Sequence, residues 1–200
     1  MSKAWHDKTY FGFWLYILSD CLLFSALFAT YAVLRTATAG GPGPDELLNV
    51  SFVFIQTLVL LFSNLAMGLA LAWSVAGKSA KQGGAWPSGP ERPVLLALAA
   101  ALLLGLVFLG LEAHEFAALI AEGHGPSTSA YLSSFFGLVG THGLHVALGS
   151  LWMIVVMVHI WLRGVNESST KLVTLGLFWH FLDIVWIFIF SVVYLLSAAL

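Results

Sequence analysis

Charged side chains are scarce in this sequence. Asp, Glu, Lys and Arg together supply 9% of its 200 residues, whereas soluble globular domains carry about 25%. Apolar side chains supply 60%, so too few polar groups are present to cover a water-soluble core. The net charge of −2 provides no basic surface for a nucleic acid. These shortages exclude an ordinary soluble domain and a nucleic-acid-binding protein, and they favour a protein whose solvent is the lipid bilayer.

Cysteine pairs and short catalytic motifs are also missing. Cys21 is the only cysteine, which excludes an internal disulfide, and its place within an apolar run favours a packing role. The sequence has no Gly-rich phosphate loop, GxSxG nucleophile elbow, HExxH zinc motif or CxxCH haem-attachment motif. No catalytic residue, metal ligand or cofactor-binding residue is therefore expected in this chain, and redox cofactors are expected in a partner protein.

Long apolar runs are abundant, and each of five runs exceeds the roughly 20 residues that cross a bilayer as a helix. The expected spans are residues 11–34, 50–75, 93–121, 131–162 and 172–198. Connectors rich in glycine and proline at 40–44, 83–87 and 123–126, and a short polar connector at 163–171, separate them. Because the connectors are short, successive helices are expected to run antiparallel. The sequence thus predicts an all-α integral membrane protein, with five transmembrane helices forming one domain over residues 1–200.

Lysine and arginine are distributed unevenly between the two ends of these spans. Seven of them fall on one side of the membrane, and only Arg35 falls on the other. The seven are Lys3, Lys8, Lys78, Lys81, Arg92, Arg163 and Lys171. The positive-inside rule therefore predicts a cytoplasmic N-terminus and a periplasmic C-terminus.

Every apolar run carries polar or ionisable residues in its interior. A charged residue facing lipid at a helix centre costs roughly 2.5 to 3.5 kcal/mol, so these side chains must face protein, a lipid headgroup or water. The residues are Asp20, Asn64, Glu112, Glu115, His142, His145, His180 and Asp183. Helical spacing places several of these residues on the same helix faces as Gly105, Gly149 and Gly176. Small residues let two helices approach closely, and polar side chains form hydrogen bonds between them. Interhelical contact is therefore the expected role of these residues.

Two further hypotheses concern metal and protons. His142 and His145 at i, i+3, with Glu112 and Glu115, are reminiscent of the Glu-x-x-His sites of di-iron bundles. The glutamates, however, lie on a different helix and are expected nearer the outer face than His142, so no metal is predicted. Asp20 is a candidate proton carrier, because an unpaired carboxylate at this depth favours protonation.

His180 and Asp183, one turn apart, are expected to pair with each other, and a structural role for this pair is favoured over proton transfer. Glu115, His124 and Arg35 are expected near the outer interface, where they could hold a phospholipid headgroup.

Three segments carry a family resemblance. Residues 11–20 (FGFWLYILSD), 135–146 (FFGLVGTHGLHV) and 178–186 (FWHFLDIVW) resemble the signature segments of subunit III of haem-copper terminal oxidases. The resemblance extends over residues 10–196. Within this family the five-span form is most similar to subunit III of bacterial bo-type ubiquinol oxidases, whereas the mitochondrial cytochrome c oxidase subunit has seven helices.

This resemblance implies a non-catalytic subunit of a proton-pumping quinol oxidase in the aerobic respiratory chain, where ubiquinol is oxidised and subunit I reduces oxygen to water. In the family, subunit I holds the haems and copper. Subunit III packs beside it, holds phospholipid in a V-shaped cleft between two helix groups and sustains proton uptake. The implied partners are oxidase subunits I, II and IV and membrane lipid, in a hetero-oligomer of the bacterial cytoplasmic (inner) membrane.

The resemblance also bears on individual residues. Asp20 matches an acidic position that is Glu in mitochondrial relatives and reacts there with a hydrophobic carbodiimide; the Asp side chain has a shorter reach than Glu. The other matching residues are His142, His145, His180 and Asp183 on motif positions, and Glu112 and Glu115 on the acidic pair of the third span. Because two helices of the seven-helix form are missing, the isolated chain is expected to expose a large apolar surface.

Alternative functions differ from this reading in testable ways. The chain could belong to a cytochrome c oxidase, since the electron donor binds elsewhere and leaves no mark on these residues. A self-contained membrane metalloenzyme or a small transporter is the alternative of another class. Stoichiometric metal in the purified chain would favour the metalloenzyme, whereas co-purification with a haem-bearing subunit would favour the oxidase.

Overall fold

The computed structural model describes residues 3–83 and 91–199, and the regular elements within them are helices. The five long helices are α1 (Lys3–Leu34), α3 (Val50–Gly83), α4 (Glu91–Ala121), α5 (Ala130–Arg163) and α6 (Val165–Ile189). The short elements are α2 (Pro44–Leu47), the π-helical segment η1 (Phe190–Leu195) and α7 (Leu196–Ala199). Five helical stretches are long and apolar enough to cross a membrane: one each in α1, α3, α4 and α5, and a fifth, Ser168–Leu195, that runs through α6 and η1. The prediction of an all-α protein with five long apolar helices is confirmed.

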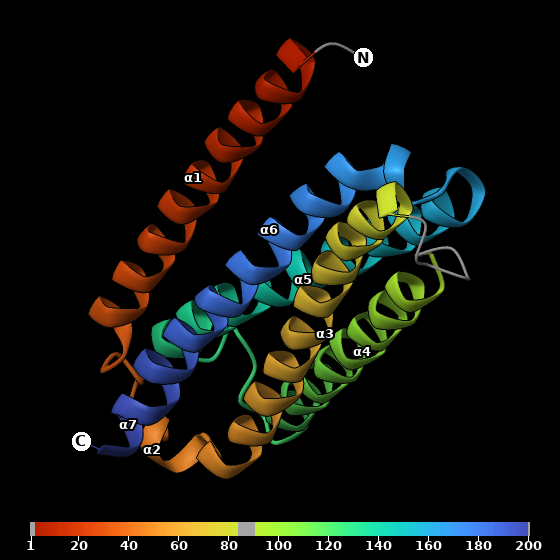
Figure 1. The fold of residues 1–200 in the computed structure, drawn as a ribbon. Coiled ribbons are helices and arrows are strands. Elements are labelled where there is room, and N and C mark those ends of the chain that lie inside the picture. The colour runs from red at the N-terminus through yellow and green to blue at the C-terminus, as the bar shows by residue number, and fades with distance from the viewer. Residues whose placement is uncertain (1–2, 84–90, 200) are drawn as a thin grey trace.

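The helices form a bundle in which α1 is set apart. Figure 1 shows α1 along one side of the bundle, beside α6, with the two helices diverging toward the N-terminus of α1. α3 packs along α4, α4 along α5, and α6 packs against both α5 and α3. The start of α1 and the end of α7 lie at opposite ends of the bundle (Figure 1), as an odd number of long helices requires.

Two links between spans differ from the predicted loops. The polar connector predicted at 163–171 is wrong, because α5 runs to Arg163 and α6 begins at Val165. Gly164 makes this turn alone with a φ of +81°, a conformation that glycine adopts without a Cβ clash. The connector after α1 contains the helical turn α2, which begins at Pro44. Of the connector predicted at 83–87, only Gly83 lies within the described residues, where it ends α3.

The last span is also interrupted. A continuous helix was expected over 172–198, but α6 ends at Ile189 and is followed by the π-helical η1. A π turn inserts one residue into an α-helix and is seldom stable without tertiary support. Tyr31 of α1 supplies part of that support, since its hydroxyl donates to the Val193 carbonyl at 3.5 Å. The π turn is therefore stabilised in part by α1, which lies far from it in the sequence.

Close helix contacts in the core occur at glycines. A methyl group added at Gly105 of α4 would lie 2.8 Å from Cζ2 of Trp179 on α6, and one at Gly149 of α5 would lie 3.0 Å from Phe178. Trp179 is almost fully buried as a result. Small residues at these positions allow the backbones to approach, as the sequence pattern predicted.

The outward faces of the bundle are apolar. Phe11, Leu22, Leu96 and Trp161 are among the many large apolar side chains that remain exposed. A soluble protein rarely exposes so much contiguous apolar surface, whereas lipid tails solvate it without cost.

Candidate functional site

Asn64 of α3 joins two ionisable residues of α6. Its Nδ2 donates to Oδ2 of Asp183 at 2.8 Å, and its Oδ1 accepts from Nδ1 of His180. An amide has both donors and an acceptor, so one side chain serves the carboxylate and the imidazole together. The predicted direct pairing of His180 with Asp183 is therefore wrong, because Asn64 lies between them.

Glu115 of α4 is held from two other elements. Gln56 Nε2 of α3 donates to its Oε2 at 3.2 Å, and the Tyr194 hydroxyl of η1 donates to its Oε1 at 3.3 Å. Gln56 and Tyr194 are fully buried. The π turn thus presents Tyr194 to α4, and Glu115 is committed to interhelical contacts. The predicted headgroup site that included Glu115 does not fit this arrangement.

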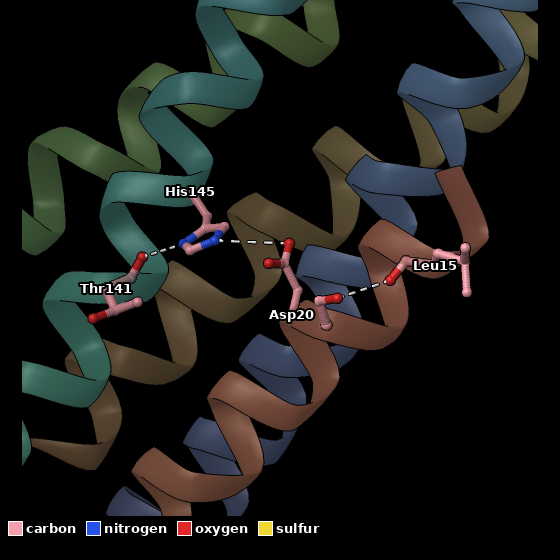
Figure 2. Close-up of polar contacts among 5 residues, drawn as sticks. Leu15, Asp20, Thr141 and His145 are labelled. Atoms are coloured by element: carbon pink, nitrogen blue, oxygen red, sulfur yellow. Dashed lines mark hydrogen bonds and ion pairs between the residues drawn. The ribbon is translucent and has the colours of Figure 1, made fainter. Parts of the chain in front are cut away.

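Asp20 of α1 faces His145 of α5 (Figure 2), with 3.8 Å between Asp20 Oδ2 and His145 Nε2. The other ring nitrogen of His145, Nδ1, lies 2.7 Å from the Thr141 carbonyl oxygen. A carbonyl can only accept, so Nδ1 carries a hydrogen and Nε2 is the nitrogen that faces the carboxyl group. The separation suits an ion pair and is too long for a hydrogen bond. Tyr16, one turn earlier on α1, also interacts with Asp20.

His142 lies where four helices meet. Its ring stacks on Trp186 of α6 with centroids 5.2 Å apart, and it meets Phe108 of α4 edge-on at 5.9 Å and Phe24 of α1 at 6.3 Å. His142 is fully buried, and neither ring nitrogen has a hydrogen-bond partner in the described part of the chain. These contacts make His142 an aromatic packing residue at the centre of the bundle.

Glu112 is buried against the backbone of α5. A methyl group added at Gly143 would lie 2.8 Å from Glu112 Cδ, so the carboxyl group fills the space that the missing side chain leaves. Gly143 follows His142 directly, which places Glu112 and His142 at similar depth. The expectation that Glu112 lies nearer the outer face than His142 is therefore wrong.

The structure disperses the residues that could have formed a metal site. Glu115 is committed to Gln56 and Tyr194, and His145 faces Asp20. Across residues 3–83 and 91–199, no group of three or more His, Cys, Asp or Glu side chains is arranged to hold a metal ion.

α3 supplies uncharged hydrogen-bond partners for residues of α4 and α6, and only part of this set was predicted from the sequence. Besides Gln56 and Asn64, Thr57 accepts from Trp186 Nε1 at 3.0 Å, and Ser63 accepts from Trp179 Nε1 at 3.1 Å. We call Gln56, Thr57, Ser63 and Asn64 the α3 polar row. The sequence analysis identified Asn64. Gln56 and Ser63 were missed, although each directly precedes another polar residue, Thr57 and Asn64 respectively. Such a polar pair within an apolar run was an available signal.

Comparison with known proteins places the chain in a family. Residues 2–198 match the family described as cytochrome c oxidase subunit III. The chain is 52% identical to cytochrome bo(3) ubiquinol oxidase subunit 3 of Pseudomonas aeruginosa, over 96% of this chain and 88% of the relative. It is 47% identical to the protein of the same name from Pseudomonas putida, over 96% and 89%.

A third relative carries a different name. The chain is 41% identical to cytochrome c oxidase subunit 3 of Bacillus sp. strain PS3, over 94% of this chain and 86% of the relative. The family match over residues 2–198 extends across all five long helices. The chain therefore belongs to the cytochrome c oxidase subunit III family.

Proposed function

We propose that this chain is subunit III of a proton-pumping haem-copper quinol oxidase of the aerobic respiratory chain, and that it has no active site of its own. The family match over residues 2–198 carries the proposal. The names of the two Pseudomonas relatives favour ubiquinol as the electron donor of the complex. The haems and copper would belong to subunit I, which would reduce oxygen to water.

The interhelical contacts support a structural role. Asn64, Gln56 and Tyr194 engage the ionisable groups of α4 and α6 within the bundle. Groups committed to each other in this way stabilise a bundle rather than bind a substrate. We propose that Asp20, Asn64, Glu112, Glu115, His142, His145, His180 and Asp183 all serve interhelical or lipid-associated roles, and that none is catalytic or binds a metal.

The proposed assembly is a hetero-oligomer in the bacterial cytoplasmic (inner) membrane. Subunits I, II and IV would cover part of the exposed apolar surface, and phospholipid would fill a V-shaped cleft beside α1. Residues 1–200 would form one transmembrane domain with a cytoplasmic N-terminus and a periplasmic C-terminus. The uneven distribution of lysine and arginine supports this orientation.

Purification of the tagged chain from its native membranes tests the proposal. A haem-bearing subunit should co-purify, and the complex should oxidise ubiquinol faster than reduced cytochrome c. Faster oxidation of cytochrome c would assign the chain to a cytochrome c oxidase instead. A chain that purifies alone with stoichiometric metal would overturn the proposal in favour of a self-contained metalloenzyme.

The proposed support of proton uptake has its own test at Asp20. Asp20→Asn keeps the size and the hydrogen-bonding capacity of the side chain facing His145. If Asp20 only stabilises the contact between α1 and α5, oxygen consumption by the complex should stay unchanged over many turnovers at alkaline pH, which is the outcome we expect. Activity that starts normal and then decays while the subunit stays bound, as seen on a gel after the assay, would instead assign Asp20 to proton delivery. Asp20→Leu, which removes the polar group from the contact, should loosen the subunit and serves as the comparison.

A further inference from the structure

Two carboxyl groups share one buried space where α3, α4, α5 and η1 meet. Glu112 and Glu115 lie one turn apart on the same face of α4, and their carboxyl groups interact electrostatically with each other. Both also interact with Tyr194 of η1. Glu112 is only 4% exposed, and Glu115 is partly buried. The two acids therefore form a single cluster rather than two separate contacts.

Among the described residues, the elements packed around these acids present uncharged polar groups to them. α3 contributes Gln56 and η1 contributes Tyr194, which in turn interacts with Tyr131 of α5. His142 of α5 lies at the depth of Glu112 but packs among aromatic rings. The groups in contact with the two carboxyls thus supply hydrogen bonds and no positive charge.

The basic residues of these helices lie far from the cluster. Those of α3, α4, α5 and α6 are Lys78, Lys81, Arg92, Arg163 and Lys171. Arg92, for example, precedes Glu112 by 20 residues, which is about 30 Å of helix. Arg35, at the end of α1, interacts with Tyr31 of its own helix. Two buried carboxylates without a nearby cation are costly, so the cluster needs another source of positive charge.

The hydrogen bonds of the cluster also lack a donor. Gln56 Nε2 and the Tyr194 hydroxyl both donate to Glu115, which accepts with both of its oxygens. Gln56 Oε1 and Glu112 Oε2 are left buried without a partner in the described part of the chain. An amide oxygen can only accept, whereas a protonated carboxyl group can donate. One hydrogen on Glu112 would therefore turn one of these two acceptors into a donor for the other.

The register of α3 against α4 brings the two unpartnered oxygens together. The Ser63 hydroxyl donates to the Ala101 carbonyl across the antiparallel pair. Seven residues back along α3 and seven forward along α4, Gln56 lies level with Phe108. Glu112 is one turn beyond Phe108, and a helical side chain leans toward the N-terminus of its helix. The Glu112 carboxyl group is thus directed to the level of the Gln56 amide.

We propose that Glu112 binds a proton and donates it in a hydrogen bond to Gln56 Oε1, while Glu115 stays the carboxylate that accepts from Gln56 and Tyr194. Two carboxyl groups that share a buried site do not both ionise, and the hydrogen-bond pattern assigns the proton to Glu112. The Gln56 amide then joins an acid to a carboxylate. The proposed function leaves the question of protons to Asp20, and the proton on Glu112 is additional to it.

Infrared spectroscopy of the purified complex tests the site. A protonated carboxyl group has a C=O stretching band that is separate from the bands of carboxylates and amides and that shifts in D₂O. At neutral pH, Glu112→Gln should remove one such band from the spectrum. Glu122→Gln, at an exposed glutamate just after α4, is the matched control and should leave the spectrum unchanged.

Amide substitutions show which acid donates and which accepts. Glutamine has the size of glutamic acid and an N–H donor in place of the O–H, so Glu112→Gln should keep the bond to Gln56 and leave the melting temperature of the complex unchanged. Glu115→Gln places a donor against the donors of Gln56 and Tyr194, so it should lower the melting temperature by several degrees.

Two results would overturn the proposal. They are an infrared band that Glu112→Gln leaves in place, and a melting temperature that Glu112→Gln lowers as much as Glu115→Gln does. If Glu112→Gln does not assemble, Gln56→Met takes its place. It removes the acceptor and should move the acid band to the position of a carboxyl group without a hydrogen bond, and an unmoved band would count against the proposal.

The haem content and quinol oxidation of each sample are measured alongside. Absence of a haem-bearing subunit from the wild-type sample would argue against the proposed function, and the infrared comparison could still be made on the chain that purifies. A failure of the proposed function is therefore distinguishable from a failure of the proton site.

Discussion

Gly143 shows how one missing side chain positions a carboxyl group. The Glu112 carboxyl occupies the space beside the α5 backbone at Gly143. Gly143→Ala should therefore force Glu112 or the helix to move and destabilise the contact between α4 and α5 by about 1 to 3 kcal/mol, the usual cost of overpacking. Thermal unfolding of the purified complex in detergent measures this loss.

Gly137, six residues earlier on α5, is the matched control, because a methyl group there would meet nothing within 4 Å. Gly137→Ala should be neutral or stabilising by up to about 1 kcal/mol, since alanine is the better helix former. Equal melting temperatures for Gly143→Ala and Gly137→Ala would show that Glu112 does not depend on the gap.

Asn64 satisfies the hydrogen-bonding groups of two ionisable residues of α6 at once. Asn64→Leu leaves the His180 Nδ1–H and the Asp183 carboxylate without the amide, at about 1 to 3 kcal/mol for each buried group. The variant complex should lose this subunit at a lower temperature, as measured by heating followed by native gel electrophoresis. Leu65→Met, on the adjacent outward-facing residue, is the control.

A double variant checks the physical reason. Asn64→Leu combined with Asp183→Leu should regain part of the lost stability, because both members of that bond are then apolar. A double variant that is less stable than either single variant would argue against the bridging role of Asn64.

At the scale of elements, the π turn η1 fixes where the end of the last span points. It contains one residue more than an α turn, so deleting Ser191 should restore an α-helix and rotate the following residues by about 100°. Tyr194 would then turn away from Glu115. We expect the deletion to lower the melting temperature of the complex at least as much as Tyr194→Phe, whereas deletion of exposed Ser127 in the loop before α5 should have little effect. A Ser191 deletion as stable as the wild type would show that η1 has no such positioning role.

At the scale of the whole molecule, the helices differ in how far the rest of the chain covers them. In the most apolar part of the α1 stretch Lys8–Leu34, 22% of the residues are buried inside the bundle. In the most apolar part of Ser168–Leu195, 61% of the residues are buried. In the isolated chain, amide hydrogen exchange in detergent should therefore be faster in α1 than in α6. Assembly into the complex should slow exchange on the side of α1 that a partner covers. Equal protection of the two helices in the isolated chain would contradict this expectation.

The length and position of the apolar runs were sufficient to predict the five helices. In lipid, a helix is one of the few structures in which an apolar run of about 20 residues satisfies its own backbone hydrogen bonds. The inward direction of residues such as Asp20 and Glu115 followed from the cost of exposing a carboxylate to hydrocarbon. The residues that these carboxyl groups contact could not be predicted in the same way. Spacing along a helix determines which residues share a face, but not which helix lies opposite, so Gln56 was missed and His145 was not paired with Asp20. The turn at Gly164 and the segment η1 depend on tertiary contacts that no local pattern encodes.

The α3 polar row has a consequence for biosynthesis. The stretch Val50–Ala76 contains no Asp, Glu, Lys, Arg or His, so its insertion into the membrane carries no cost for an ionisable side chain. Its hydrogen-bonding side chains are then already in place when Glu115 and, later, His180 and Asp183 are translated. For α4 and α6, the helix that supplies these hydrogen-bond partners is therefore synthesised before the ionisable groups it contacts. The order of the sequence thus lowers the barrier to inserting the more polar second half of the chain.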